Sequence, residues 1–262
     1  MSDAPTPSPR TRRAAPPFRR ATVVGTEAVT PRLIRVTIEG EALVGFPMPE
    51  PAGSVRLLLP EPDTFDLPTW AANNFVYADG RRPTLRTLTP VATDPALGRL
   101  ALEVVQHTAG RAATWAAAAR AGDAAAISGP ARGYVPPATA RGFLLGGDET
   151  AIPALIQLAA AVPDGVPTDV LVEVPDRAAR RDVSHRRGVS VHWIDGGAVP
   201  GAALAEAFEA RRVDDGTHVW AGGEAAAMQR IRRHLYETLG IERSRATARG
   251  YWKHGRSASN DG

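Results

Sequence analysis

The sequence contains no cysteine and very little lysine. The missing cysteine excludes disulfides, iron–sulfur clusters and thiolate metal sites. None of the six histidines stands in a His-Glu-x-x-His spacing, so we expect no resident metal ion. Lys253 is the only lysine among the 31 basic residues, and the rest are arginine. Aromatic residues make up 6% of the chain, too few for a basic, aromatic-rich nucleic-acid surface, and we expect no nucleic-acid partner.

Long apolar runs are also absent. The longest apolar stretch covers residues 151–162 and is interrupted by Pro153 and Gln157, whereas a transmembrane helix needs about 20 apolar residues. The N-terminus carries arginines with no apolar core after them, which excludes a secretory signal. These absences predict a cytoplasmic protein without membrane insertion.

What is present predicts a globular chain of two domains. Apolar residues make up 44% of 262 residues, enough for two cores. Residues 1–18 are rich in Pro, Ser, Ala and Arg and predict a disordered arm. A first domain is expected over residues 19–140 and a second over residues 141–256, with a short tail at 257–262.

The first domain is rich in short segments with strand character. Because only one helix, at 112–121, interrupts them, we expect antiparallel pairing and a β-barrel or sandwich. The second domain alternates short apolar strands with helices, which predicts a parallel sheet in an α/β domain. The strands expected in the first domain are 21–25, 32–39, 55–59, 84–88, 100–106 and 124–128. In the second domain, strands are expected at 143–145, 170–174, 189–194 and 219–221, and helices from 151, at 203–210 and at 225–239.

Two glycine-containing turns in the second domain lie where a strand leads into a helix. The segments 146–153 (GGDETAIP) and 222–224 (GGE) occupy the position at which α/β sheets receive nucleotides. Both also suit ordinary helix starts, with Asp148 or Thr150 as the N-cap and Pro153 in the first turn. The residues alone leave both interpretations open.

Three further segments combine charge with features of a binding site. Arginines between 177 and 187 are able to accept the 2′-phosphate of NADP, or else they are simply solvated. Segment 81–86 (RRPTLR) suits a phosphate and a hydrogen-bonding ring, or a charged strand edge. Segment 250–256 (GYWKHGR) suits an anionic planar ligand, or a last strand anchored by Trp252.

In their order along the chain, these segments resemble the siderophore-interacting protein family, the ferric-siderophore reductases of the ferredoxin-reductase superfamily. The resemblance runs from about residue 20 to 256 and is most specific in GDETAIPAL (147–155) and GYWKHG (250–255). It implies an antiparallel FAD-binding β-barrel followed by a parallel-sheet α/β domain that binds NAD(P)H.

The resemblance also implies roles for particular residues. Arg81 would lie at the FAD phosphates, Thr84 near flavin N5, and the stretch 107–115 around the pyrophosphate. No side chain is expected to act as a catalytic acid or base. The cofactor-binding residues implied are Arg81, Pro83, Thr84, Arg86, His107, Gly110, Ala112, Thr114, Asp148, Glu149, Thr150, Pro153, Gly222, Gly223 and Glu224. Trp252, Lys253 and Arg256 are implied to bind an anionic ferric siderophore.

Two departures from the family pattern fall on the flavin side. Pro83 replaces the tyrosine whose ring would stack on the isoalloxazine, and residues 110–113 read Gly-Arg-Ala-Ala instead of Gly-Pro-Ala-Ser/Thr. The leading expectation is an NAD(P)H-dependent, FAD-containing ferric-siderophore reductase that releases Fe(II). The alternative is a redox-inactive homologue that uses its inter-domain pocket as a cofactor-free biosynthetic enzyme or as a small-molecule binding protein.

Overall fold

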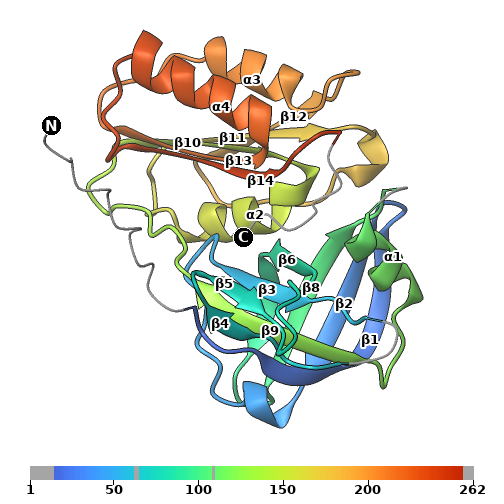
Figure 1. Cartoon of the computed structure of the whole chain (residues 1–262). Helices are drawn as coiled ribbons and strands as arrows, with labels where there is room; N and C mark the ends of the chain where they lie inside the picture. The colour runs from blue at the N-terminus through green and yellow to red at the C-terminus, as the bar shows by residue number, and fades with distance from the viewer. Residues whose placement is uncertain (1–14, 62–64, 108–109, 256–262) are drawn as a thin grey trace, which may run out of the picture.

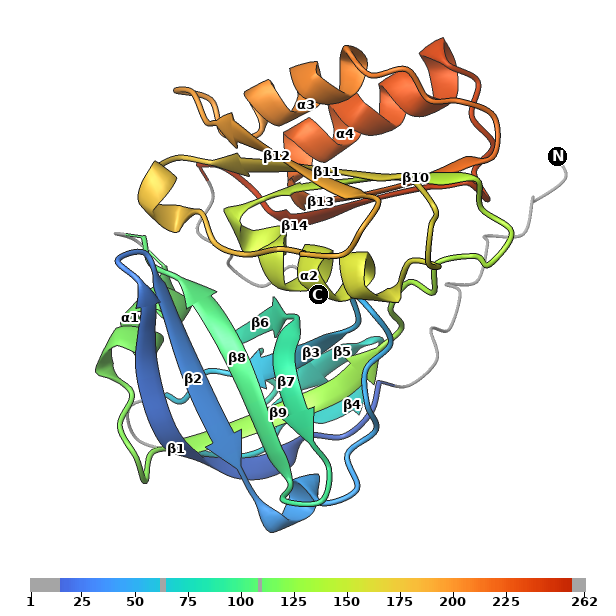
Figure 2. The ribbon, with the colours of Figure 1, turned by 180° about the vertical axis from the view of Figure 1, so that it is seen from behind.

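The first domain is built on one antiparallel sheet. The computed structural model describes residues 15–61, 65–107 and 110–255. Seven strands pair in the order β6-β3-β9-β1-β2-β8-β7. These strands are β1 (Arg19–Thr30), β2 (Leu33–Glu39), β3 (Ser54–Leu58), β6 (Leu85–Leu88), β7 (Pro90–Asp94), β8 (Arg99–Val105) and β9 (Ala124–Ala131). Only Thr89 separates β6 from β7 in the chain although they lie at opposite ends of this order, so the sheet curves round as the barrel in Figures 1 and 2.

Alternating side chains fill this barrel. In β2, Val36 and Ile38 are fully buried, whereas Arg35 and Thr37 between them are partly exposed, as expected for a strand with one face in a core. The 3-10 helix η1 (Glu41–Leu43) adds Leu43 to the same core, and the helix α1 (Arg111–Ala118) packs against β2 and β8. The predicted antiparallel barrel is therefore confirmed.

A small hairpin covers part of the outer face of the barrel. It consists of β4 (Thr69–Ala71) and β5 (Asn74–Val76), two strands that the sequence did not predict. Phe75 from this hairpin meets Phe18 with ring centroids 4.8 Å apart. Phe18 was expected in a disordered arm, but it is 6% exposed because its ring completes this outer cluster. Residues 1–14 of that arm and the tail 257–262 lie outside the described residues.

The second domain is a parallel sheet in the order β12-β11-β10-β13-β14. Helix α2 lies on the face toward the barrel, and α3 and α4 cover the opposite face (Figure 1). The strands are β10 (Gly142–Asp148), β11 (Thr168–Val174), β12 (Val189–Asp195), β13 (Thr217–Glu224) and β14 (Ala246–Trp252). The helices are η2 (Glu149–Ala151), α2 (Ile152–Ala161), η3 (Arg177–Ala179), α3 (Ala202–Glu209), α4 (Ala225–Arg233) and η4 (His234–Thr238). The predicted α/β domain is confirmed, and the strand order reverses between β10 and β13.

Glu103 and Gln157 are among the residues that connect the two domains through polar contacts. Glu103 of β8 is 5% exposed and accepts hydrogen bonds from Arg181 of the second domain at 2.8 and 2.5 Å. Gln157 of α2 accepts from the backbone N–H of Ala52 at 2.9 Å and donates to the carbonyl of Pro90 at 2.6 Å. Within the described part of the chain, no helix is long and apolar enough to cross a membrane.

Candidate functional site

Strand β6 brings two predicted residues to the mouth of the barrel beside α1. Thr84 precedes the strand and is 6% exposed, and Arg86 lies two residues later on the same face. The backbone carbonyl of Thr84 accepts from the N–H of Leu59 at 3.0 Å, which fixes the start of β6 against the end of β3.

Arg86 lies close to a second cation, Arg111 at the start of α1. Burial and the charge of Arg111 lower the pKa of Arg86. Among the described residues, neither arginine forms an ion pair with a carboxylate, and Arg86 donates to the carbonyl of Leu85 at 2.7 Å. Two neighbouring guanidinium groups without an anion are suited to a phosphate group.

The first turn of α1 completes this cationic region. Its N-cap, Gly110, provides no side-chain cap, so among the described residues the first backbone N–H groups of the helix have no side-chain acceptor. The exposed imidazole of His107 lies directly against Gly110, at the place where a Cβ atom would be. Ala112 is buried behind it, and Thr114 is exposed on the helix. The predicted residues of this region all belong to the barrel domain: Thr84, Arg86, His107, Gly110, Ala112 and Thr114.

Arg81 and Pro83, the two other predicted residues of segment 81–86, have different surroundings from each other. The guanidinium of Arg81 forms ion pairs with Asp79 at 2.6 Å and Glu61 at 2.8 Å, and both carboxylates raise its pKa. Its side chain is 59% exposed, so these pairs are weak enough to exchange for another anion. Pro83 is buried and supplies no aromatic ring.

On the α/β side, Asp148 is a hydrogen-bond acceptor for four groups. Asp148 is 7% exposed and ends β10. Its carboxylate accepts from the backbone N–H of Thr150 at 2.9 Å and from its hydroxyl at 2.5 Å. It also accepts from the N–H of Glu224 at 2.8 Å and from Nε1 of Trp252 at 2.7 Å. Burial raises the pKa of Asp148, while these four donors favour its charged form.

Glu224 performs a similar task at the end of β13. It is 3% exposed and caps α4 by accepting from the N–H groups of Ala226 at 2.6 Å and Ala227 at 2.9 Å. Its other oxygen accepts from the N–H of His254 at 3.1 Å. Asp148 and Glu224 therefore join the segments 146–153, 222–224 and 250–256 into one cluster.

Glu149 reaches across the domain boundary. Its carboxylate, in a residue 8% exposed, receives Nε and Nη2 of Arg32 from the barrel, each at 3.1 Å. This hydrogen bonding raises the pKa of Arg32. The sequence contained no signal for Arg32, because its partner lies 117 residues further along the chain. Pro153 is buried in the first turn of α2, where proline is tolerated.

The glycines between these carboxylates allow close packing of β10 against β13. Gly223 has φ +153°, and a Cβ there would lie 2.6 Å from Oδ2 of Asp148. A Cβ at Gly147 would lie 2.6 Å from the carbonyl oxygen of Gly222. These positions require glycine because the two strand ends touch each other.

The C-terminal segment places Tyr251, one of its two aromatic residues, against the barrel. Tyr251 is 37% exposed, while its hydroxyl shares a hydrogen bond with Thr89 of the barrel. Desolvation raises the pKa of Tyr251 to about 12. Lys253 is exposed and forms no ion pair with the described residues, and Arg256 lies outside them.

The arginines between 177 and 187 are largely engaged elsewhere. Arg177 and Arg180 both bind Asp195, at 3.1 and 2.5 Å. Arg186 binds Asp164 and the last carbonyl groups of α2, and Arg181 binds Glu103 as described above. This region therefore stabilises loops and the domain boundary.

Comparison with known proteins agrees with this architecture. Residues 22–134 match the family described as "Siderophore-interacting FAD-binding domain", and residues 140–255 match "Siderophore-interacting protein". A siderophore utilization protein from T. fusca, known as a crystal structure, superposes with a TM-score of 0.81 at 31% identity, over 95% of this chain and 98% of that chain. The chain belongs to the siderophore-interacting protein family. Its barrel matches the FAD-binding domain of that family.

Two curated relatives differ from each other in overall length. The NADPH-dependent ferric-chelate reductase of Escherichia coli is 28% identical over 90% of this chain and 92% of its own length. The mycobactin import ATP-binding/permease protein IrtA of Mycolicibacterium smegmatis is 31% identical over 91% of this chain. This siderophore-interacting chain spans only 26% of the length of that transporter.

Proposed function

We propose that this protein is an NAD(P)H-dependent, FAD-containing ferric-siderophore reductase. The observation that carries the proposal is the pair Arg86 and Arg111, two neighbouring cations that have no carboxylate partner among the described residues, beside the start of α1, whose N-cap is a glycine. Guanidinium groups and free backbone N–H groups are the donors that a diphosphate requires. The residues of the barrel therefore fit FAD.

Each domain has a separate part in this function. Arg86, Arg111 and the N–H groups of the first turn of α1 would hold the pyrophosphate, and Thr84 would lie beside the flavin ring. The nicotinamide would approach at the carboxyl ends of β10 and β13, where Gly222 leaves the ring of Tyr251 uncovered. Lys253 would attract an anionic ferric chelate.

Bound FAD would supply the redox chemistry by accepting two electrons from one nicotinamide nucleotide and passing them singly to two ferric chelates. The overall reaction converts NAD(P)H and two Fe(III) into NAD(P)⁺, one proton and two Fe(II). Hard oxygen chelators hold Fe(II) less tightly than Fe(III), so that reduction releases the metal.

The experiment is anaerobic reduction of a ferric siderophore by the FAD-loaded protein, followed with a chromogenic Fe(II) chelator. NADPH and NADH are compared, and catecholate, hydroxamate and phenolate chelates are each supplied. We expect two Fe(II) per nucleotide oxidised with at least one chelate. A protein that binds FAD but oxidises neither nucleotide in the presence of any chelate would contradict the proposal and favour the redox-inactive alternative.

A further inference from the structure

The turn between β1 and β2 brings the barrel against the end of β10. This turn consists of Pro31 and Arg32, the two residues between the paired strands. The backbone of Arg32 is held at both of its polar groups. Its N–H donates to the hydroxyl of Thr30 at 3.2 Å, and its carbonyl accepts from the N–H of Gln106 at 2.7 Å. The side chain of Arg32 therefore extends from a backbone that is anchored in the barrel.

The guanidinium of Arg32 binds the carboxylate of Glu149 as a fork. Its Nε donates to Oε1 and its Nη2 donates to Oε2, each at 3.1 Å. Two parallel bonds fix the direction of the carboxylate as well as its distance. This hydrogen bonding raises the pKa of Arg32, and the charge of Asp176, just after β11, raises it further. The side chain of Glu149 is only 9% exposed, so the loss of Arg32 would leave a buried charge without its partner.

Glu149 directly follows the residue that joins the ends of three strands. That residue, Asp148, ends β10 and accepts from the N–H of Glu224 at the end of β13 and from Nε1 of Trp252 at the end of β14. A displacement of Glu149 is therefore passed on to the ends of all three strands. Arg32 holds the α/β domain at the edge of the sheet where the nicotinamide is proposed to approach.

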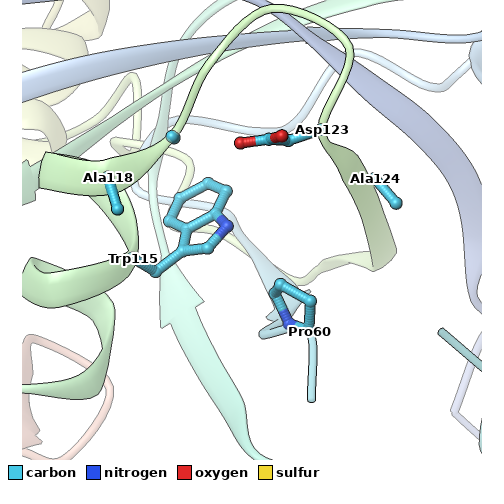
Figure 3. A pocket seen from close by; sticks show the side chains of 6 residues that line it. Pro60, Trp115, Ala118, Asp123 and Ala124 are labelled. Atoms are coloured by element: carbon cyan, nitrogen blue, oxygen red, sulfur yellow. The ribbon is translucent and has the colours of Figure 1, made fainter. Parts of the chain in front are cut away.

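Arg32 differs from other boundary contacts in the strand that it holds. Arg181 lies in the loop after η3, Gln157 lies in α2, and Tyr251, which shares a hydrogen bond with Thr89, lies in β14. The cavity shown in Figure 3 is lined by barrel residues, so it does not connect the domains. Arg32 is the contact that fixes the end of β10 relative to the barrel.

We propose that Arg32 is a positioning residue for hydride transfer from the nicotinamide nucleotide to FAD. It acts through Glu149, by holding the end of β10 at one distance and orientation from the barrel. In this step the C4–H bond of the nicotinamide breaks and a bond forms at N5 of the flavin; both electrons move with the hydride, so the nucleotide is oxidised and FAD is reduced. Reacting atoms must lie about 3–3.5 Å apart, and a shift of about 1 Å costs roughly 100-fold in rate. The inference rests on the proposed function and adds to it a residue that acts without touching either reactant.

The first measurement is hydrogen exchange of the apoprotein, followed by mass spectrometry. Arg32→Gln removes the fork, and residues 149–155 should exchange about 10-fold faster than in wild type because the end of β10 opens more often. Arg99→Gln is the matched control, since it breaks an ion pair with Glu39 inside the barrel domain. It should leave exchange at residues 149–155 unchanged.

The second measurement is anaerobic reduction of the FAD-loaded protein in a stopped-flow instrument, at rising concentrations of NADPH and of NADH. Arg32→Gln should lower the limiting rate about 10- to 100-fold, while its affinity for FAD and the nucleotide concentration at half-saturation change little. The long-wavelength charge-transfer absorption of a nicotinamide stacked on the flavin should be lost as well. Arg99→Gln should match wild type in the rate and in this absorption.

Two further variants keep the test decisive. Arg32→Lys guards against misfolding of Arg32→Gln, because it keeps a cation beside the buried carboxylate, and it should recover part of the rate and of the charge-transfer absorption. Arg181→Gln breaks a boundary contact that lies away from β10, and Glu103 still keeps Arg35 as its partner. It should slow flavin reduction much less than Arg32→Gln does.

The outcomes separate this inference from the proposed function. If both Arg32 variants reduce the flavin as fast as wild type, or if Arg181→Gln is as slow as Arg32→Gln, the positioning role is wrong while the reductase proposal survives. Slow reduction without faster exchange at residues 149–155 would also overturn the inference, because Arg32 would then not act through Glu149. A wild-type protein that binds FAD but is reduced by neither nucleotide would contradict the proposed function, and the role of Arg32 would fail with it.

Discussion

In the barrel domain, Arg86 and Arg111 lie close together, and no carboxylate in the described part of the chain pairs with either of them. On the α/β side, the carboxylates of Asp148, Glu149 and Glu224 are all engaged by donors of the protein itself. Both domains carry charged motifs next to glycines in the sequence, and on the sequence alone both motifs suit a cofactor. The comparison teaches that unpaired polar groups indicate ligand binding better than motifs do, because engaged groups already stabilise the fold.

The largest effect is expected for a substitution on the α/β side, whose carboxylates are already hydrogen-bonded within the protein. Asp148→Ala leaves the buried N–H of Glu224 and the indole N–H of Trp252 without an acceptor. We expect a loss of roughly 2–5 kcal/mol in the free energy of unfolding, measured with urea, because each unsatisfied buried donor costs about 1–3 kcal/mol. Asp176→Ala is the matched control, because Asp176 also follows a strand and caps a turn but is exposed. Equal losses in the two variants would contradict a special role for Asp148.

The next largest effect is expected for a substitution in the barrel, where Arg86 is available to bind a phosphate. Arg86→Ala removes a cation that no described carboxylate neutralises, so the fold should persist while phosphate binding weakens. We expect both FAD and FMN to bind about 10- to 100-fold more weakly, since a hydrogen bond to a charged group contributes about 1.5–3 kcal/mol. Calorimetry measures both affinities. Arg177→Ala removes an exposed arginine that is already paired with Asp195, and it should change neither affinity. Unaltered flavin binding by Arg86→Ala would disprove the assignment.

A smaller effect on FAD binding is expected for a substitution at Pro83 of the barrel. Pro83→Tyr restores the ring that the family pattern carries at this position, and an aromatic contact adds about 0.5–1.5 kcal/mol beyond its buried area. FAD should bind about 2- to 10-fold more tightly, with stronger quenching of flavin fluorescence. Pro83→Ala serves as the control, because it removes proline without adding a ring. Identical quenching in the two variants would show that position 83 does not face the flavin.

The smallest effect concerns pH and the far end of the parallel sheet. Burial and the nearby Arg245 lower the pKa of His218, at the start of β13, below its ordinary 6.5. The unfolded chain therefore binds the proton first, so the stabilising contribution is present above pH 6.5 and is lost as the pH falls below that value. The urea midpoint should fall more between neutral and mildly acidic pH for wild type than for His218→Gln. The same pH dependence in both proteins would exclude His218 as its source.

The sequence predicted the order of domains and most central strands, because buried strands such as β10 and alternating strands such as β2 have strong apolar patterns. It missed the β4–β5 hairpin, whose strands are three residues each, and β7, which starts at Pro90 and alternates with Thr and Asp. These elements form through pairing with neighbours and have little local signal of their own.

The candidate site was predicted only in part. The family resemblance brought Arg86, Gly110 and Thr84 into one hypothesis, and all three belong to the barrel domain. It did not reveal that Glu149 is held by Arg32, because that contact joins residues 117 positions apart. Whether a charged side chain is paired depends on such distant partners, so local sequence patterns do not predict it.

The measurement that tests the account most directly is the visible absorption spectrum of the purified protein after incubation with FAD and desalting. The account predicts a yellow protein that retains about one FAD per chain, and Arg86→Ala should lose most of it. A wild-type protein that stays colourless would show that the free cations of the barrel do not hold a flavin, and the central claim would be wrong.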